Sequence, residues 1–540
     1  MQIITRGPAI TLFATIAILG LAGMAGSQSA QARTLVFCSE GNPEALNPQI
    51  VTTTTGLNAA RPMFNQLIEF EPGSTQIRPA LAESWDVSPD GMEYIIRLRD
   101  GVQFHTTDIF MPTRAMNADD VLFSLERQWK DDHPFHDVSD ASYAYFKDMG
   151  MPDLLKSIDK IDDLTLRISL TRPEAPFLAN LAMPFNSILS AEYAEQLLAA
   201  GTPELLDEKP VGTGPFIFDG AQKDVAVRYR VFPDYWDGRQ PIERLVFSVT
   251  PNPAVRLTKM KAGECHVMAF PNPSDTKTIV DDPNLQLLQQ EGFNIGYLSL
   301  NISKPPFDDI RVRRAINMAI DKEAVIEGAY GGAGVVAKNP IPPTLWSYNE
   351  DVEDYPYDPL AAQRLLAEAG YPNGFETDLW YMPVSRPYNP DAMRVAEMIQ
   401  ADLAEIGIRA NLVTEEWGEY RESLQNGEHS MALYGWTGDN GDPDNFLNVL
   451  LGCTAARIGG NNVSRWCNAE FDDLVTRAKL SYDQSVREEL YRQAQEIFKR
   501  EAPWVPIAHS VVFMGARDEV DGFRMDPLGR HAFDKVRLTD

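Results

Sequence analysis

Hydrophobic and polar positions in the first half of the chain predict short strands joined by tight turns. Residues 94–98 alternate between apolar and polar side chains, which is the pattern of a half-buried strand. Turn signals bound this segment on both sides, with Ser-Pro-Asp-Gly at 88–91 and Asp-Gly at 100–101. The same kind of pattern predicts further strands at 34–37, 226–232 and 244–249.

The second half is more helical, because its apolar residues recur at the spacing of one buried helix face. Asn389 is the expected N-cap of one helix, with Pro390 in its first position and Gly407 at its end. An earlier helix is expected to begin after the cap residue Asn117. The alternation of helices and strands predicts α/β layers. Helices are expected at 310–330, 358–370 and 389–407, and a strand at 408–413.

The first 32 residues have the pattern of a secretory signal. The basic residue Arg6 precedes an apolar run from Ala9 to Ala25, and the small-x-small triplet 30–32 follows. A transmembrane anchor is the alternative interpretation, but the run is shorter than the about 20 apolar residues that a bilayer requires. We therefore predict export and cleavage after Ala32.

The length of the chain and its net charge limit the classes of protein to which it can belong. The chain has 540 residues, of which 44% are hydrophobic, so it can bury a large core and is expected to contain several domains. Lys and Arg number 48 against 77 Asp and Glu, which gives a net charge of −29. So acidic a chain is poorly suited to bind nucleic acid or anionic lipid through charge.

Four cysteines fit an exported protein with two disulfides, and four cysteines allow three pairings. Cys453 and Cys467 are close in sequence and are separated by a loop with two glycines and two asparagines, so we pair them. Cys38 then pairs with Cys265. Free thiols are the alternative, and zinc ligation is disfavoured because no CxxC pair exists.

The usual motifs of hydrolases, zinc peptidases and nucleotide-binding proteins are absent from the sequence. Two other segments carry candidate binding chemistry. Residues 381–390 form a proline-framed loop with Arg386, and residues 435–444 combine a tryptophan, several carboxylates and glycines that let backbone approach a ligand. A fixed guanidinium and a fixed carboxylate would suit a zwitterion. A surface ion pair and a solvated acidic turn remain the alternatives.

Six segments resemble the periplasmic dipeptide-binding proteins of bacterial ABC importers, within family 5 of the peptide and nickel solute-binding proteins. The resemblance extends over nearly the whole chain after the predicted signal. Segments 382–390 and 435–444 and all four cysteines are similar to the dipeptide-binding branch in particular. The six segments are 38–44, 117–121, 171–179, 212–216, 382–390 and 435–444.

This resemblance implies an α/β, two-lobed periplasmic-binding-protein fold with an additional inserted domain (class II-like, cluster C). One lobe would be discontinuous and the other continuous, and the inserted domain would precede the central part of the discontinuous lobe. The implied boundaries are 1–32 for the signal peptide, 33–65, 210–293 and 509–540 for lobe I, 66–209 for the inserted domain, and 294–508 for lobe II.

The resemblance also implies the roles of individual residues. Asp439 would pair with the α-ammonium of a peptide, and Arg386 would pair with its α-carboxylate. A Thr-Ser-Gly stretch that meets the peptide backbone in the dipeptide-binding branch corresponds here to three threonines, so that Thr54 adds a side chain where the branch has glycine. The remaining residues implied to contact ligand are Thr52, Thr53, Pro387, Tyr388, Trp436, Thr437 and Gly438.

The implied function is that of a periplasmic receptor, monomeric and without cofactor or metal, which delivers dipeptides to inner-membrane ABC permease subunits and catalyses no reaction. The same scaffold could instead take a longer peptide, haem or a tetrapyrrole precursor, glutathione or a nickel chelate. An exported metallopeptidase is the alternative from a different class, but the sequence offers no clustered His and Glu ligand set for it.

Overall fold

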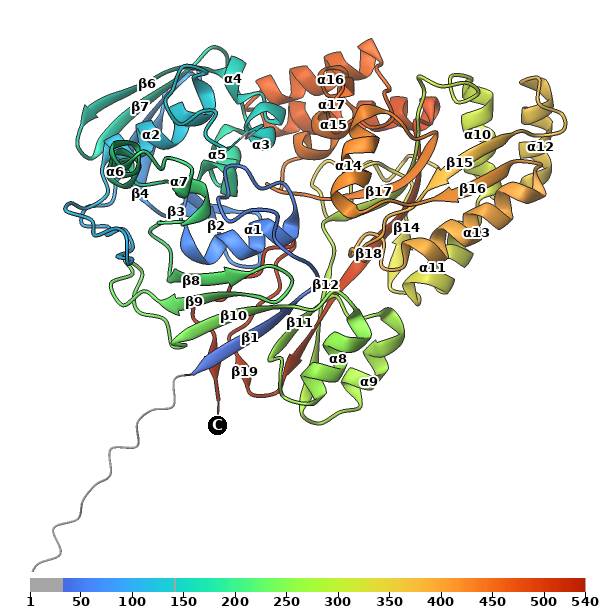
Figure 1. Cartoon of the computed structure of the whole chain (residues 1–540). Coiled ribbons are helices and arrows are strands. Elements are labelled where there is room, and N and C mark those ends of the chain that lie inside the picture. The colour runs from blue at the N-terminus through green and yellow to red at the C-terminus, as the bar shows by residue number, and fades with distance from the viewer. Residues whose placement is uncertain (1–32, 140–141, 540) are drawn as a thin grey trace, which may run out of the picture.

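A mixed sheet of twelve strands runs through the protein (Figure 1). The computed structural model describes residues 33–139 and 142–539, so the predicted signal at 1–32 lies outside the described residues. The strands lie in the order β16 (Arg409–Val413), β15 (Glu376–Trp380), β17 (Met431–Thr437), β13 (Asn294–Leu300), β18 (Trp504–Arg517), β11 (Val267–Ala269), β1 (Thr34–Ser39), β10 (Arg244–Val249), β9 (Ala226–Val231) and β8 (Phe216–Gln222). The strands predicted at 34–37, 226–232, 244–249 and 408–413 are therefore confirmed.

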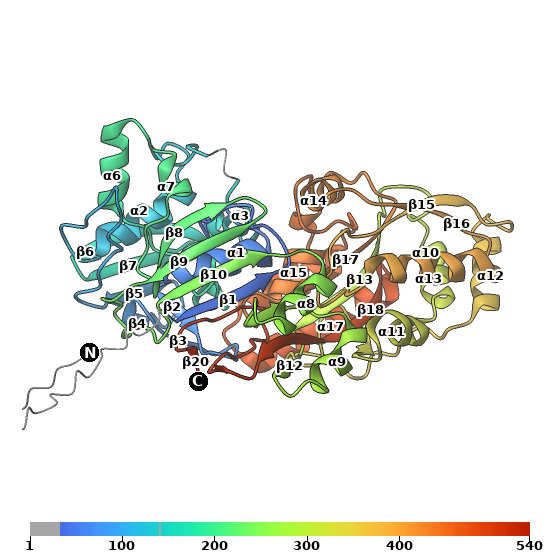
Figure 2. The same ribbon diagram turned by 60° about the horizontal axis from the view of Figure 1, so that its bottom comes forward.

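The long strand β18 belongs to both ends of this sheet. Its first residues pair with β13 and with β14 (Gly334–Val336), and its last residues pair with β11 and with β12 (Leu285–Glu291). Gly292 and Phe293 connect β12 to β13 beside the same part of β18, and the Asn294 side chain accepts a hydrogen bond from the Ser510 N–H (3.1 Å). Figure 2 shows β1, β8, β9 and β10 on one side of the molecule and β13 and β15–β17 on the other. The chain thus crosses between the two ends at adjacent positions.

A separate antiparallel sheet of four strands lies at the upper left of Figure 1. Its order is β4 (Ala82–Val87), β5 (Glu93–Leu98), β7 (Thr165–Leu170) and β6 (Leu155–Asp162). Helix α2 (Ala118–Trp129) begins at the predicted cap, where the Asn117 side chain accepts from the Asp119 N–H (2.9 Å) and the Asp120 side chain accepts from the Asn117 N–H (2.9 Å). Two of the other helices of this region are α3 (Ala144–Asp148) and α6 (Ala191–Ala200).

Helices cover the sheet on the side of β13, β15 and β17, where buried aliphatic residues such as Leu298, Ile316, Ile399 and Leu433 form one apolar cluster. The helices here are α10 (Ile310–Ala319), α11 (Lys322–Tyr330), α12 (Pro359–Glu368), α13 (Ala392–Glu405) and α14 (Trp417–Asn426). Helices α15 (Asp444–Leu451), α16 (Ala469–Leu480) and α17 (Gln484–Glu501) follow in the chain. Within the described part of the chain, no helix combines the length and the apolar character needed to span a bilayer.

Two predicted helix boundaries are wrong. The single helix expected over 310–330 is broken at Asp321, whose side chain accepts from the Ala324 N–H (3.0 Å) and so begins α11. Asp391, not Asn389, caps α13, because its side chain accepts from the Arg394 N–H (3.1 Å). The helix predicted at 358–370 is confirmed as α12, which Asp358 caps.

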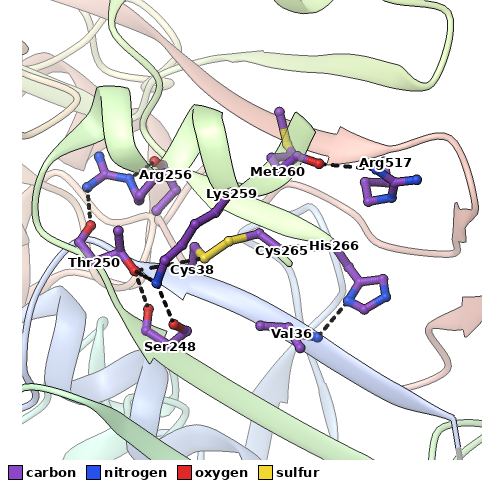
Figure 3. Close-up of a disulfide and its surroundings, with 11 residues drawn as sticks. Val36, Cys38, Ser248, Thr250, Arg256, Lys259, Met260, Cys265, His266 and Arg517 are labelled. Carbon is purple, nitrogen blue, oxygen red and sulfur yellow. Dashed lines mark hydrogen bonds between the residues drawn. A yellow bond between two sulfur atoms is a disulfide. The ribbon is translucent and has the colours of Figure 1, made fainter. Parts of the chain in front are cut away.

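Both predicted disulfides are present. Cys38 of β1 is joined to Cys265, with a Cα–Cα distance of 5.8 Å, and Cys453 is joined to Cys467, with a distance of 4.6 Å. Figure 3 shows the first bond beneath α8 (Pro253–Lys261), from which Lys259 donates to the Thr250 hydroxyl (3.1 Å). This bond ties the start of the described chain to a segment 227 residues away.

Candidate ligand-binding site

One chamber gathers most of the residues that the sequence marked for ligand binding. Its wall comes from the segment before and at the start of α1 (Thr54–Ala60), from the loop after β15, and from β17 with the residues that follow it. Pro387 lines two cavities next to the chamber, and Gly438 lies behind its wall. The predicted residues that line the chamber itself are Thr52, Thr53, Thr54, Arg386, Tyr388, Trp436, Thr437 and Asp439.

Arg386 is buried in a tight loop rather than exposed in a surface ion pair. The backbones of Arg386 and Asn389 exchange two hydrogen bonds, of 3.1 and 2.9 Å, which close the loop between β15 and α13. Its Nη1 donates to Oε1 of Glu40 (3.1 Å), and its guanidinium lies over the Trp417 ring, 5.3 Å from the ring centroid. The remaining donors of this guanidinium are available to the chamber that it lines.

Glu40 forms an ion pair with Arg386. Burial alone would raise the pKa of Glu40, but the Arg386 guanidinium and the hydroxyl of Thr55, which donates to Glu40 (2.6 Å), together hold it below its usual value. Glu40 therefore stays ionised and fixes the orientation of Arg386. The ion pair neutralises part of the charge of Arg386 and leaves the planar fork to meet a second carboxylate.

Asp439 has hydrogen-bond donors around it but no cation. The Tyr145 hydroxyl donates to its Oδ1 (3.2 Å), and the Asn445 amide donates to its Oδ2 (3.1 Å). Among the residues that the structure describes, no Lys, Arg or His forms an ion pair with it. Burial raises the pKa of Asp439 to about 7, against the opposing effect of these two hydrogen bonds. A cationic group in the chamber would complete this site.

Glu44 holds the threonine segment in place. Its carboxylate accepts from the backbone N–H groups of Thr52 (2.9 Å) and Thr53 (2.7 Å). The Thr53 hydroxyl in turn caps α1 by accepting from the Gly56 N–H (3.1 Å). Thr54, the residue that departs from glycine in the dipeptide-binding branch, is the first residue of α1 and faces the chamber and two adjoining cavities.

Several chamber residues were missed from the sequence. Arg421 donates to the Thr52 hydroxyl (2.9 Å) from α14, one helical turn after Trp417. This i, i+4 spacing of an aromatic and a cationic residue is a signal that could have found them. Glu40 and Tyr145 carry no such signal, because their partners Arg386 and Asp439 are hundreds of residues away.

Two glycines of segment 435–444 make room for protein side chains, and one of them, Gly435, also lines the chamber. A Cβ on Gly435 would lie 2.1 Å from Cδ2 of Tyr388, and one on Gly438 would lie 2.4 Å from Cδ1 of Phe293. The acidic residues that follow do not form a solvated turn either. Asp442 is buried in an ion pair with Arg487 (2.7 Å), which closes this segment onto α17.

The described side chains do not form a metal-binding cluster. Within residues 33–139 and 142–539, no group of three or more His, Cys, Asp and Glu side chains is arranged to hold a metal ion. The described residues that line the chamber include no histidine or cysteine. The chamber instead offers one carboxylate without a counter-ion, two guanidinium groups, hydroxyls and aromatic rings. This set of groups suits a small ligand that carries both charges.

Known proteins resemble this chain over nearly its whole length. The sequence profile of the bacterial extracellular solute-binding proteins, family 5 middle, matches residues 76–457. The chain is 51% identical over 521 residues to the dipeptide-binding protein of Escherichia coli K12, covering 96% of this chain and 97% of that protein. It is 50% identical over 508 residues to heme-binding protein A of Haemophilus influenzae, covering 94% of this chain and 92% of that protein.

Solved structures give the same picture of the fold. The dipeptide-binding protein of Pseudoalteromonas sp. SM9913 in complex with Met-Leu matches with a TM-score of 0.91 and 38% identity, covering 94% of this chain and all of that chain. This match confirms the predicted two-lobed α/β fold.

Proposed function

The chain belongs to the bacterial extracellular solute-binding proteins of family 5, and we propose that it captures dipeptides in the periplasm and delivers them to an ABC transporter. The observation that carries this proposal is the pair of opposite charges on the wall of one chamber, Arg386 and Asp439. A dipeptide presents the complementary pair at its two termini.

Each terminus of the ligand has a matching protein group. The α-ammonium replaces the missing counter-ion of Asp439, whose two hydrogen-bond donors already orient its carboxylate. The α-carboxylate meets the donors of Arg386 that Glu40 does not use. Arg421 adds positive charge to the same chamber. The threonines at the start of α1 contribute hydroxyl and backbone groups to the ligand backbone.

The two charged anchors, Arg386 and Asp439, have fixed positions, so they select ligands by the distance between the charged termini. A peptide amide removes the charge that Arg386 binds, and a longer peptide cannot bring both termini to the two anchors at once. Such a ligand leaves either Asp439 without a counter-ion or the ligand-facing donors of Arg386 without an acceptor, which costs about 1–3 kcal/mol or more. We therefore propose that the chamber rejects both amidated dipeptides and tripeptides, and that it performs no reaction on its ligand.

We propose the same domain boundaries that the resemblance implies. In this proposal lobe I comprises 33–65, 210–293 and 509–540, the inserted domain comprises 66–209, and lobe II comprises 294–508. The strand β18 and the β12–β13 connection are then the two links between the lobes, and hinge bending at these links closes the lobes over the ligand and signals occupancy to the permease. In this proposal the signal directs export and is removed after Ala32.

Isothermal titration calorimetry of the purified, ligand-stripped protein tests the dipeptide proposal. A dipeptide, its C-terminal amide and the matching tripeptide are titrated in parallel. Tight one-to-one binding of the dipeptide alone is the expected result, and Arg386→Ala should abolish it. Equal heats from all three ligands, or none from the dipeptide, would overturn the proposal.

Haem is the second candidate, because heme-binding protein A of Haemophilus influenzae is 50% identical to this chain. The described residues that line the chamber include no histidine, cysteine or methionine, so the haem-iron ligands that they offer are the tyrosines Tyr145, Tyr388 and Tyr434. A Soret-band titration in the presence and absence of dipeptide separates the two candidates. Haem binding that dipeptide does not displace would place haem outside this chamber.

A further inference from the structure

A second cavity opens from the chamber beside Asp439. Thr54, Tyr145, Thr437 and Asp439 line both spaces, so the two cavities adjoin at the proposed ammonium anchor. Arg61, which directly follows α1, also lines this side cavity. A ligand residue with its ammonium at Asp439 therefore has space for its side chain in the direction of Arg61.

The Arg61 guanidinium is a cation without a partner. Its Nε is buried and has no hydrogen-bond acceptor, and Arg61 forms no ion pair within the part of the chain that the structure describes. Burial lowers the pKa of Arg61 to about 9, which still leaves it charged at neutral pH. An acidic side chain in the side cavity would supply a counter-ion for this guanidinium.

The carboxylates around Arg61 are engaged elsewhere or lie further away. Asp526 pairs with Arg530 (2.5 Å), and Glu69 pairs with Arg78 (3.2 Å). Asp534 lines a neighbouring cavity with Arg61 and interacts with it only over a longer distance. The side cavity between Asp439 and Arg61 therefore presents a guanidinium that the protein leaves uncompensated at short range.

The cavity at the other anchor has a different character. It adjoins Arg386 and is lined by Phe270, Val512 and Pro527 together with Pro387 and Tyr388. Arg386 is the one charged residue among the described residues around it. A ligand residue with its carboxylate at Arg386 would place its side chain in these apolar surroundings, where an aliphatic group gains most.

We propose that the two side cavities select the sequence of the dipeptide, with Arg61 favouring an acidic first residue and the Phe270 cavity favouring an apolar second residue. This inference rests on the dipeptide function proposed above. It makes Arg61 the residue that determines specificity for the first side chain. Thr54 takes part as well, because its methyl and hydroxyl groups lie at the junction of all three spaces.

Calorimetry with three matched dipeptides tests the inference. Glu-Val, Gln-Val and Lys-Val share the same backbone and second residue and differ in the charge of the first side chain. Glu-Val should bind at least about tenfold more tightly than Gln-Val, and Lys-Val should bind most weakly. In Arg61→Gln the ratio of the Glu-Val and Gln-Val affinities should fall close to one. Arg97→Gln, which removes an exposed guanidinium paired with Asp86 outside the side cavity, should keep the ratio of the wild-type protein.

The outcomes separate this inference from the proposed function. Binding of Glu-Val and Gln-Val with equal affinity to the wild-type protein would overturn the role of Arg61 and leave the dipeptide function standing. Failure of all three dipeptides to bind would overturn both. The wild-type comparison decides the question even where Arg61→Gln folds poorly, and circular dichroism identifies that case.

Discussion

The guanidinium of Arg386 and the carboxylate of Glu40 form a buried ion pair, with 3.1 Å between Nη1 and Oε1, across 346 residues of sequence. Glu40 follows β1 closely and Arg386 follows β15, so the pair connects the two ends of the large sheet. The proposed carboxylate anchor is therefore oriented by a residue from the other end of the large sheet. The effects of this ion pair on ligand binding and on protein stability can be measured separately.

Replacing Arg386 by Met should reduce both binding and stability, because Glu40 is then buried without its cation. The free energy of unfolding should fall by about 3 kcal/mol at pH 7. The double variant Arg386→Met/Glu40→Gln should recover most of that loss but should not bind dipeptide. Urea unfolding and calorimetry measure the two effects. A double variant as unstable as Arg386→Met would instead assign the cost to lost packing on Trp417.

Dipeptide affinity should depend on pH through Asp439, whose pKa burial raises to about 7 in the ligand-free protein. Below that pH the free protein holds a proton that the ligand ammonium must displace, so affinity should fall by about tenfold per pH unit. Above roughly pH 8 the ammonium itself deprotonates. The affinity should therefore be greatest between these values, and Asp439→Asn should bind weakly without the acid-side fall.

The same raised pKa makes a prediction for the ligand-free protein. A folded-state pKa above the unfolded value contributes stability at low pH that is lost as pH rises toward about 7. Asp439→Asn should thus be more stable than the wild-type protein at pH 8, by up to about 4 kcal/mol. Thermal unfolding at pH 5 and pH 8 checks this, and an advantage for the variant at pH 5 alone would contradict it.

The sequence predicted those features of the fold that depend on interactions between residues close to one another in the chain. Asn117 and Asp358 were identified as caps because their side chains act on the next turn of their own helices. The break at Asp321 was missed because α10 and α11 bury residues in the same apolar cluster, so the helical spacing continues across it. Proximity in sequence was sufficient to assign the disulfides.

The residues of the site also divide into those that the sequence predicted and those that it could not. The resemblance carried Arg386 and Asp439 over by position, and the structure places both on one chamber. Glu40 and Tyr145, which orient them, could not be found from the sequence, because those contacts exist only once distant segments have folded together. Arg61 was missed for a further reason. Its significance lies in the absence of a partner, and a sequence pattern does not show this.

The two disulfides should contribute unequally to stability. The loop closed by Cys453 and Cys467 spans 14 residues and that closed by Cys38 and Cys265 spans 227. Loop-closure entropy gives about 3 kcal/mol for the first and about 5 kcal/mol for the second. Paired Cys→Ala variants in urea unfolding measure the difference, with the reduced wild-type protein as control. A larger loss for the shorter loop would contradict the entropic account.

Gly435→Ala should distort the wall of the chamber. Its Cβ would lie 2.1 Å from the Tyr388 ring and 2.6 Å from the Ile295 carbonyl oxygen, and neither group has room to retreat, since Gly435 pairs with Gly296 in the β13–β17 ladder. Tyr388 is also held by the Tyr330 hydroxyl, which donates to its carbonyl (2.8 Å).

The added methyl group should therefore displace Tyr388 and, with it, the loop that carries Arg386. Overpacking of this kind costs about 1–3 kcal/mol in stability, and dipeptide affinity should fall with it. Gly41→Ala is a matched control, because its Cβ meets only an ordinary contact with Thr55 at 3.7 Å. Adding Tyr388→Ala to Gly435→Ala should not restore stability, because the contact with the Ile295 carbonyl oxygen remains and a buried ring is lost. Unchanged dipeptide affinity in Gly435→Ala would contradict this prediction.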